Sequence, residues 1–324
     1  MIDTINLDIF PIISVPSFTC YENNIIAPVA KMLGEDVFVY FSTHFQIKYL
    51  RNNPDDLYHL SIYSGFKNEI IKKYYGISIT TISCKDMRLE DFYKSIRKEK
   101  EQGKIVGVMT DAYNCPWNRK FLRKIHMEHY FLIGKVGDTK DSDIMCYDGF
   151  FSNDVEQIPF KQLYLLSKAL ILIEIDITQK ANKKSISYYL YNGLTYCKSN
   201  YINVLKEFSM DIRNLNFQKE LDKCNKDIAE ADVILNIIKI EKARTNYFMA
   251  LNNFEKQGVA KIPEDILSLL KNDIDFWEQA KGRVIQALLN QRKSSLNKAA
   301  DIFCKIGSTE EEICDKLSVF LKSD

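Results

Sequence analysis

Three side chains in the first half of the chain are of the types used by enzymes that carry out nucleophilic catalysis with a thiol. Cys20 stands between Thr19 and Glu22 in the stretch Ser-Phe-Thr-Cys-Tyr-Glu. Thr19 followed three residues later by Glu22 matches a capping box, which predicts a helix with Cys20 at its first position. The positive end of the helix dipole would favour a thiolate, so we expect the pKa of Cys20 to be depressed. A buried structural cysteine is the alternative interpretation.

A histidine and an aspartate farther along the chain could activate that thiol. His129 opens a nearly continuous apolar run, and a polar turn over residues 137–143 separates this run from a second one that ends at Asp148. If the two runs form a β-hairpin, its centre falls inside the turn, and His129 and Asp148 face each other across the strands. A hydrogen bond from imidazole to carboxylate would then orient His129 as the base. The alternative is a lone histidine at a strand end and an unrelated turn aspartate.

A third group of candidates follows the predicted strand over residues 105–109. Here Asp111, Tyr113 and Trp117 lie in one loop. A loop leaving a strand beside the histidine strand would line a substrate channel, with Tyr113 and Trp117 as walls and Asp111 meeting a polar or amine group. A surface turn with a half-buried tryptophan is the alternative.

The elements that must position these side chains fall into two regions with different sequence patterns. In the first half, strand-like runs alternate with turns over residues 37–41, 105–109, 130–136, 144–147 and 169–177. Helices are predicted over residues 19–33 and 89–100, and Pro28 should kink the first of them. A polar linker over residues 179–185 ends this region.

Beyond the linker the pattern is helical. One apolar stripe has spacings of three and four residues and comprises Leu221, Cys224, Ile228, Ala231, Leu235 and Ile238. A further helix is predicted to begin at Pro263, and the last one at a capping box over residues 308–311. We therefore predict an α+β fold, with a catalytic domain over residues 1–178 followed by a helical domain over residues 186–324. The helical domain would act as a lid or bind substrate or a partner.

The balance of charged residues argues against a general nucleic-acid-binding protein. Lys and Arg together number 44 and Asp and Glu 43, so no global field would attract nucleic acid. A local basic cluster, Arg119, Lys120, Arg123 and Lys124, could receive a phosphate or an acidic partner, or could simply be a solvated face.

The compartment and the absence of a metal follow from other features of the sequence. The N-terminus lacks the basic and apolar regions of a signal peptide, and the most apolar stretch, residues 169–177, is too short to cross a membrane. None of the eight cysteines forms a CxxC pair, and His126 with His129 lacks further ligands for a metal. We expect a cytoplasmic protein with reduced thiols, no metal and no membrane association.

Three short stretches resemble the N-terminal domain family of the butirosin-pathway acyltransferase, a papain-like cysteine fold of bacterial secondary metabolism. They are Thr-Cys-Tyr-Glu-Asn at residues 19–23, Val-Met-Thr-Asp-Ala-Tyr at residues 108–113 and His-Tyr-Phe-Leu-Ile-Gly at residues 129–134. The resemblance covers roughly residues 10–175, and Cys20, His129 and Asp148 match the positions of its catalytic triad. The chain is also similar to amide synthetases of thio-templated assembly of the closthioamide type.

The resemblance implies an activity, partners and a cofactor arm. Family members move an acyl group from a carrier-protein thioester, held on phosphopantetheine, to an amine and form an amide without ATP. The expected partners are thus an acyl or peptidyl carrier protein and a small amine, with no bound cofactor, in antibiotic biosynthesis. Papain-type enzymes carry a glutamine shortly before the cysteine, and residues 1–19 contain none. Asn23 or the helix N–H groups are the remaining candidates for the oxyanion donor.

Two other functions compete with acyl transfer. A cysteine peptidase or amidase would use the same triad with water as the acceptor. A catalytically silent helical interaction protein would use none of it. The sequence does not indicate the acyl chain, the amine or the oligomeric state.

Overall fold

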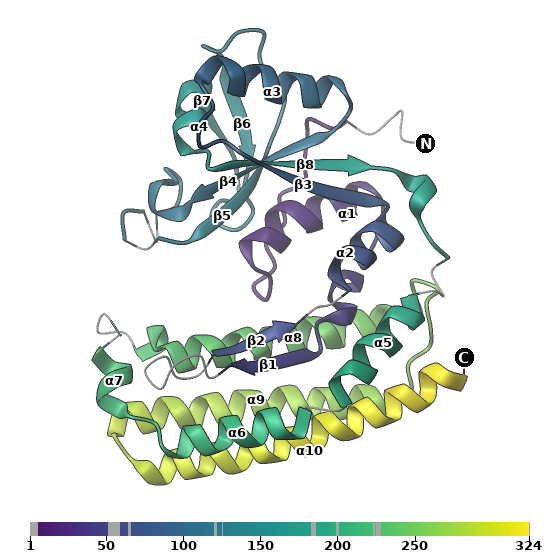
Figure 1. The fold of residues 1–324 in the computed structure, drawn as a ribbon, viewed down its shortest axis with the longest axis vertical. Helices are drawn as coiled ribbons and strands as arrows, with labels where there is room; N and C mark the ends of the chain where they lie inside the picture. Colours follow the sequence, from purple (N-terminus) through teal and green to yellow (C-terminus); the bar gives the residue numbers. More distant parts are fainter. Residues whose placement is uncertain are drawn as a thin grey trace. The chain divides into compact units, whose positions relative to one another are not determined.

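The computed structural model divides the chain into two compact units (Figure 1). The first comprises Met1–Val37 and Ile71–Ala181, and the second Phe38–Ile70 and Asn182–Asp324. The structure describes residues 6–50, 59–63, 66–119, 122–124, 126–182, 186–198, 201–222, 224 and 228–323. Each unit is described by itself below.

A six-stranded antiparallel sheet forms the centre of the first unit, in the order β3-β8-β4-β5-β6-β7. Its strands are β3 (Ile77–Ser83), β4 (Ile105–Asp111), β5 (Glu128–Ile133), β6 (Asp143–Tyr147), β7 (Val155–Pro159) and β8 (Ala169–Ile175). Strands β4, β5, β6 and β8 confirm four of the predicted apolar runs. The continuous apolar sequence of β8 fits its place between two other strands, where both of its faces are covered.

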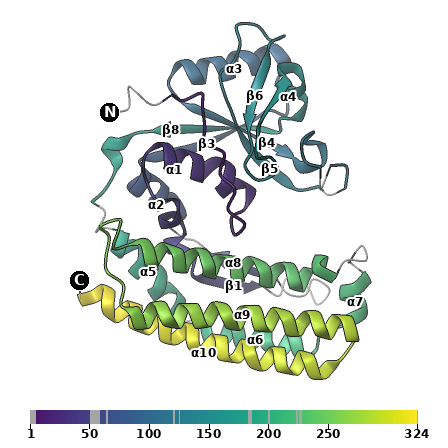
Figure 2. The same cartoon turned by 180° about the vertical axis from the view of Figure 1, so that it is seen from behind.

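Helices cover both faces of this sheet (Figures 1 and 2). On one face, α3 (Leu89–Glu101) and α4 (Phe160–Leu166) bury Phe92, Phe160 and Leu163 against the strands. On the other face, Ile25 of the N-terminal helical segment approaches the sheet where Gly107 of β4 has no side chain. A Cβ atom at Gly107 would lie 3.0 Å from Ile25 Cδ1, so the close approach depends on glycine here.

The N-terminal helical segment begins at Cys20, as predicted. Glu22 accepts hydrogen bonds from both the Thr19 N–H, at 2.6 Å, and the Thr19 hydroxyl, and the Glu22 N–H reaches Thr19 Oγ1 at 3.4 Å, which confirms the capping box. The segment then runs as a π-helical turn, Glu22–Ile26, before α1 (Ala27–Met32). Pro28 thereby falls in the first turn of α1, where its missing N–H is tolerated. The change of helix type falls just before Pro28, where the sequence predicted a kink.

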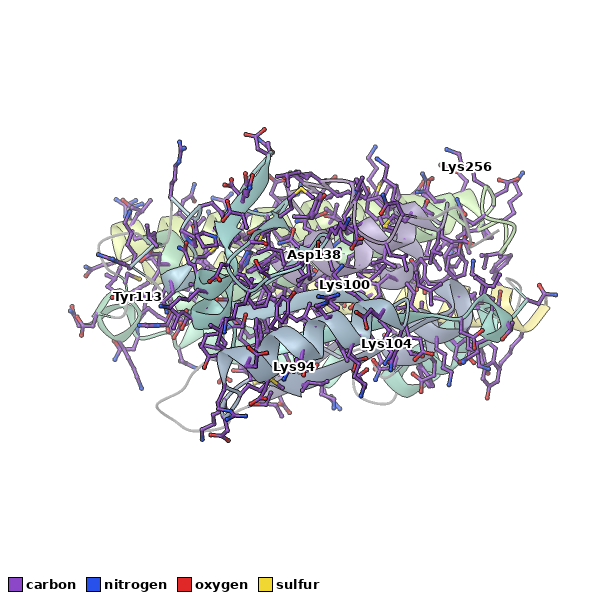
Figure 3. The ribbon with its side chains drawn as sticks, turned by 90° about the horizontal axis from the view of Figure 1, so that it is seen from above. Lys94, Lys100, Lys104, Tyr113, Asp138 and Lys256 are labelled. Carbon is purple, nitrogen blue, oxygen red and sulfur yellow. The ribbon has the colours of Figure 1, made fainter. Side chains whose placement is uncertain are left out.

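The residues before Cys20 are anchored to the sheet and to α3. Lys100 Nζ on α3 binds Asp8 Oδ1 at 2.7 Å, and the Tyr147 hydroxyl donates to the Asp8 carbonyl at 3.2 Å. Phe10 packs edge-on against the Tyr147 ring. Figure 3 views the molecule from the side of α3, with Lys94, Lys100 and Lys104 labelled. The segment that carries Cys20 is therefore fixed at its start.

The second unit combines a two-stranded hairpin with long helices. Its elements are β1 (Gln46–Leu50), β2 (His59–Tyr63), α2 (Lys67–Ile70), α5 (Ile186–Lys198), α6 (Tyr201–Arg213), α7 (Phe217–Asp222), α8 (Asp232–Asn253), α9 (Glu264–Asn290) and α10 (Lys293–Ser323). The hairpin packs against α8 through β2 and against α5 and α6 through β1. Helix α9 begins directly after Pro263, close to the predicted start.

Three local predictions were wrong. Residues 37–41 belong to a 3-10 helix, Val37–Thr43, and not to a strand. The stripe over residues 221–238 is not one helix, because α7 ends at Asp222 and Glu220 accepts from the Val233 N–H at the start of α8. Residues 308–311 lie inside α10, where the Ser308 and Thr309 hydroxyls bond to carbonyls one turn earlier instead of capping a new helix.

The domain boundaries also differ from the simple division into residues 1–178 and 186–324. The chain leaves the first unit after Val37 and returns at Ile71, because the hairpin between these points buries Ile47 and Leu60 within the helical unit. Of the predicted linker, residues 183–185 lie outside the described part of the chain. No helix among the described residues is long and apolar enough to cross a membrane.

Candidate active site

The candidate site lies beside the first residues of β5, where, among the described residues, the β6 edge of this strand has no partner strand. Along its β4 edge, β5 pairs over its first five residues, with His129 opposite Thr110. Along its β6 edge, it pairs only at Leu132 and Ile133. The carbonyls of Glu128 and Tyr130 are therefore open to side chains from the N-terminal helical segment.

The hairpin of β5 and β6 brings His129 and Asp148 together in a register shifted from the one we predicted. Leu132 lies opposite Tyr147, so an extended ladder would pair His129 with Phe150, two residues beyond Asp148. His129 and Asp148 are thus diagonal neighbours, which long side chains can bridge. Their side chains meet all the same, with His129 Nε2 at 2.6 Å from Asp148 Oδ2.

The Asp148 carboxylate is fully buried and accepts five hydrogen bonds. The donors are His129 Nε2 (2.6 Å), Trp117 Nε1 (2.6 Å), Asn24 Nδ2 (2.7 Å), Phe150 N (3.1 Å) and Phe151 N (3.2 Å). Burial alone would raise the pKa of Asp148, but the bond and charge of His129 and the bonds from Trp117 and Asn24 lower it overall. The carboxylate is therefore ionised.

Gly149 lets the chain turn sharply after Asp148. A Cβ atom at this position would lie 2.0 Å from the carbonyl oxygen of Ile13, so the N-terminal segment passes directly over the glycine backbone. The turn directs the N–H groups of Phe150 and Phe151 back at the Asp148 carboxylate. Glycine is the only residue type that allows this close approach.

His129 is fully buried among aromatic rings. The ring of Phe151 lies 4.3 Å from the imidazole, centroid to centroid, and that of Phe150 lies at 6.1 Å. Because the ionised Asp148 can only accept, Nε2 of His129 carries a proton, and when the ring is neutral Nδ1 does not. Within the described part of the chain, no group hydrogen-bonds to Nδ1. This nitrogen is the one available as a base.

Asn24 joins the helical segment of Cys20 to the strand of His129. Its Nδ2 donates to the Tyr130 carbonyl and to Asp148 Oδ1, each at 2.7 Å. Asn24 follows Cys20 by about one helical turn and is almost completely buried. No local pattern marks this role, since the contact joins positions that are 124 residues apart.

Cys20 lies beside the same strand, with its Sγ donating to the Glu128 carbonyl at 3.6 Å. It is 7% exposed. Burial raises the pKa of Cys20 to about 12, and the charges of Asp148 and Glu22 add to the rise while the Tyr130 backbone opposes it. The depressed pKa that we expected from the helix dipole is therefore wrong for this state. The thiol keeps its proton unless a base takes it.

A second thiol, for which the sequence offered no role, lies near the pair. The sulfur of Cys115, a nitrogen of His129 and an oxygen of Asp148 are all within 4.8 Å of one another. These residue types can hold a metal ion, but a carboxylate has about four lone-pair sites. Asp148, with five donors, has none left to bind a cation.

The remaining sequence candidates are occupied by other contacts. The side chain of Asn23 bonds to both the N–H and the carbonyl of Val15, at 2.8 and 3.2 Å, so its amide is engaged in holding the loop before Cys20. The candidate oxyanion donors that remain are the N–H groups at the helix start.

Asp111 and Tyr113 also serve local structure. Asp111 accepts from Lys168 Nζ at 2.9 Å and bonds to His126 Nδ1 at 3.0 Å, and these bonds outweigh burial and lower its pKa. Tyr113 stacks on the His126 ring at 4.1 Å. Of the three candidates that the sequence offered in this loop, Trp117 reaches the site, through its bond to Asp148.

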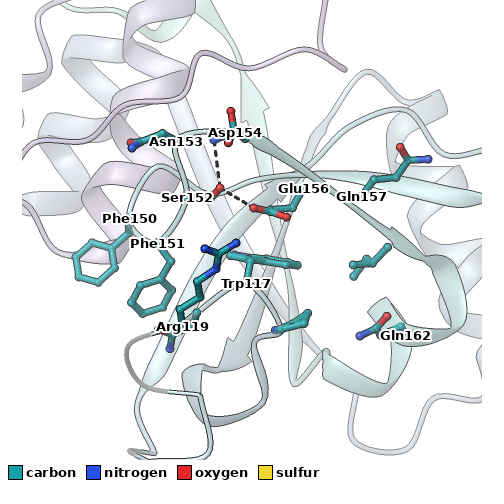
Figure 4. Close-up of a pocket in the computed structure, with 13 residues that line it drawn as sticks. Trp117, Arg119, Phe150, Phe151, Ser152, Asn153, Asp154, Glu156, Gln157 and Gln162 are labelled. Carbon is teal, nitrogen blue, oxygen red and sulfur yellow. Dashed lines mark hydrogen bonds between the residues drawn. The ribbon is translucent and has the colours of Figure 1, made fainter.

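A cavity of about 710 Å³ adjoins the aromatic side of His129 and Asp148, and we call it the Trp117 pocket (Figure 4). Its walls include Trp117, Arg119, Phe150, Phe151, Asp154 and Glu156. Trp117, Phe150 and Phe151 each contact the His129–Asp148 pair as well. The predicted role of Trp117 as a pocket wall agrees with this placement, whereas Tyr113 is not part of the lining.

Comparison with known proteins adds no assignment. Neither a scan against protein-family models nor a search of curated proteins found a match to this chain.

Proposed function

We propose that the first unit is a papain-like cysteine acyltransferase that works without ATP. Cys20 would take an acyl group from a thioester, such as one on the phosphopantetheine arm of a carrier protein, and pass it to an amine. The observation that carries this proposal is the state of His129. One of its nitrogens is bonded to a buried, ionised carboxylate, and the other has no partner in the described part of the chain.

The roles of the three residues follow from their environments. A Cys20 thiol with a raised pKa is a weak nucleophile and needs a base to remove its proton as it attacks. His129 supplies that base at Nδ1, and Asp148 holds the tautomer and stabilises the imidazolium. The helix N–H groups that follow Thr19 would donate to the oxyanion.

The chemistry balances in two steps. The Cys20 proton moves to His129, the new bond joins sulfur to the acyl carbon, and the donor thiol leaves with the proton. In the second step the neutral amine attacks and gives a proton to His129, a carbon–nitrogen bond forms, the bond to Cys20 breaks and His129 passes that proton to the Cys20 sulfur. No oxidant, reductant or nucleotide takes part.

The same triad would serve a hydrolase, in which water replaces the amine. The burial of the pair favours transfer, since His129 and Asp148 are 0% exposed and aromatic rings enclose the imidazole. A site that excludes water protects a thioester from hydrolysis.

Intact-mass analysis after incubation with an acyl thioester tests the proposal. An adduct should form, map to the peptide of Cys20 and disappear when a competent amine is added, with amide appearing in equal amount. The Cys20→Ala variant should form no adduct. Cys84→Ala, which removes another buried thiol, is the matched control and should behave like the parent.

Three outcomes would overturn the proposal in different ways. An adduct on Cys115 would make Cys115 the nucleophile in place of Cys20. An adduct cleared by water as fast as by any amine would make the protein a hydrolase. No adduct with any thioester would leave the catalytically silent interaction protein.

A further inference from the structure

The Trp117 pocket holds charged groups that the described structure does not pair with each other. Arg119 and Asp154 are exposed, and Glu156 is half-buried. Among the residues that the structure describes, no ion pair within 4.0 Å joins the Arg119 guanidinium to Asp154 or to Glu156. Opposite charges that line one cavity without neutralising each other leave room for a ligand that meets both.

One of the two carboxylates is fixed in place. Ser152 Oγ donates to Glu156 Oε1 at 2.6 Å and in turn accepts from the Asp154 N–H at 3.1 Å, as drawn in Figure 4. No donor to Oε2 of Glu156 is found in the described part of the chain. A carboxylate held by one oxygen, with the other directed elsewhere, is pre-organised to accept from an ammonium group.

Besides the charged groups, the pocket has an aromatic wall. Trp117, Phe150 and Phe151 supply it, and Trp117 packs edge-on against Phe131 below. Aromatic faces bind both apolar groups and cations. A volume of about 710 Å³ lies in the range of pockets that hold small molecules.

We propose that the Trp117 pocket binds a zwitterionic small molecule of the α-amino acid class. The ammonium group meets Glu156 and Asp154, the carboxylate meets Arg119, and an apolar side chain lies on the aromatic wall. A purely cationic ligand would leave Arg119 unmatched and repelled, and a purely anionic one would do the same to the two carboxylates.

The pocket shares Trp117, Phe150 and Phe151 with the surroundings of His129, so its ligand is placed next to the proposed reaction centre. Resting on the proposed function, this makes the amino acid the acyl acceptor. The bound ammonium first releases one proton to solvent. The neutral amine then attacks the acyl carbon and forms the carbon–nitrogen bond, while its second proton passes through His129 to the Cys20 sulfur as the carbon–sulfur bond breaks.

Binding is measured first in the Cys20→Ala variant, where no chemistry can intervene. Three probes of matched shape separate the charges: L-phenylalanine carries both, phenethylamine only the ammonium and 3-phenylpropionate only the carboxylate. Titration calorimetry or ligand-observed NMR should show that L-phenylalanine binds about fivefold more tightly than either of the others, as expected for one partly exposed ion pair.

Two substitutions should abolish this preference in opposite ways. Arg119→Gln should make phenethylamine bind as well as L-phenylalanine, and Glu156→Gln should do the same for 3-phenylpropionate. The controls, Arg88→Gln and Glu90→Gln, change exposed charges near α3 and should leave all three affinities unchanged. Equal affinities for the three probes, no binding, or equal effects of both pocket variants on every probe would overturn the proposal.

The proposed function can fail separately from this one. If L-phenylalanine binds as expected in Cys20→Ala but the parent forms no acyl adduct, the zwitterion-binding pocket is supported and the acyltransferase proposal is refuted. If the adduct forms and simple amines release it while L-phenylalanine neither binds nor reacts, the acyltransferase proposal is supported and the zwitterion-binding pocket is refuted.

Discussion

Each of the two tryptophans in the chain donates its indole N–H to a buried carboxylate. In the first unit Trp117 donates to Asp148 at 2.6 Å, and in the second unit Trp277 donates to Glu310 at 3.0 Å. The other donors differ in kind. Asp148 receives neutral amides and an imidazole, whereas Glu310 is bound by the fully buried guanidinium of Arg244 at 2.6 and 3.1 Å.

The second unit also buries a carboxylate that lacks donors. Asp273 lies 3.7 Å from Arg244 Nε, and neither of its oxygens has a hydrogen-bond partner within the described residues. Burial, followed by the charge of Glu310, raises the pKa of Asp273 well above its usual value, although Arg244 opposes the rise. Asp273 therefore keeps its proton.

Asp148 and Asp273 are equally buried, yet their pKa values shift in opposite directions. Burial penalises the charge of both carboxylates, and the supply of hydrogen-bond donors decides the outcome. The first unit supplies five donors to one carboxylate, which in the proposed mechanism stays charged to orient a base. The second unit uses its charges to fix the packing of helices.

The largest effect is expected at the carboxylate with five donors. Asp148→Asn should lower the rate of acyl transfer by about 10⁴-fold, because the amide presents N–H groups to donors and no longer holds the His129 tautomer. The rate of amide formation from a thioester measures this. Asp111→Asn is the control, since Asp111 is also ionised and bonded to a histidine but lies outside the pair. Full activity in Asp148→Asn would remove Asp148 from the mechanism.

Removing the buried guanidinium of Arg244 tests how the second unit depends on its buried charges. Arg244→Met should destabilise the second unit by about 3–5 kcal/mol, because Glu310 is left as an uncompensated buried charge. The double variant Arg244→Met/Glu310→Leu should recover most of that loss. Urea unfolding followed by Trp277 fluorescence reports the second unit if it is measured in a Trp117→Phe background. A loss below 1 kcal/mol would show that water or another group compensates Glu310.

A smaller effect is expected when one donor of several is removed. Trp117→Phe should lower the unfolding free energy of the first unit by about 2 kcal/mol, the value of one hydrogen bond to a charged group. Asp148 keeps four other donors, so acyl transfer should fall far less than in Asp148→Asn. Trp277→Phe is the matched change in the second unit and should leave acyl transfer intact. Equal losses of activity in the two variants would contradict the division of roles.

The smallest expected effect is the change of unfolding free energy with pH, and its direction follows from the two pKa shifts. The folded-state pKa of Asp273 is raised, so its contribution to stability is present below about pH 4, the unfolded pKa, and is lost as pH rises through the folded pKa. Asp273→Asn should therefore gain stability relative to the parent as pH rises from 4 to 8. The folded-state pKa of Asp148 is lowered, so its contribution is present above about pH 4, the unfolded pKa, and is lost as pH falls through the folded value. Asp148→Asn should therefore gain stability relative to the parent as pH falls below about 4. Unfolding free energies in which Asp273→Asn does not gain on the parent above that pH, or Asp148→Asn does not gain below it, would refute the comparison.

Local patterns allowed the sequence to predict part of the site. The capping box at Thr19 and the hairpin of β5 and β6 each join residues close in sequence, and both formed. The hairpin register was missed by two positions, because β6 ends at Tyr147 and Gly149 turns the chain beneath Ile13. No pattern within the hairpin carries that information.

Contacts between distant segments could not be predicted. The bonds from Asn24 and Trp117 to Asp148, and the proximity of Cys115, depend on how the helical segment and a loop pack on the sheet. The raised pKa of Cys20 has the same origin, since burial and neighbouring carboxylates outweigh a helix terminus. In the second unit, Glu310 lies within the predicted capping box over residues 308–311 and is instead the partner of Arg244.

The passage of residues 38–70 into the second unit sets an order for assembly during synthesis. Once Ala181 has been made, every residue of the first unit exists, and the intervening segment is a loop whose closure adds little free energy. The β1–β2 hairpin, however, is made long before α8, against which β2 packs. Its apolar residues Ile47 and Leu60 must wait for the C-terminal helices. A nascent chain would therefore complete its sheet, with Cys20, His129 and Asp148 in place, while an unpartnered hairpin extends from it as a target for chaperones or proteases.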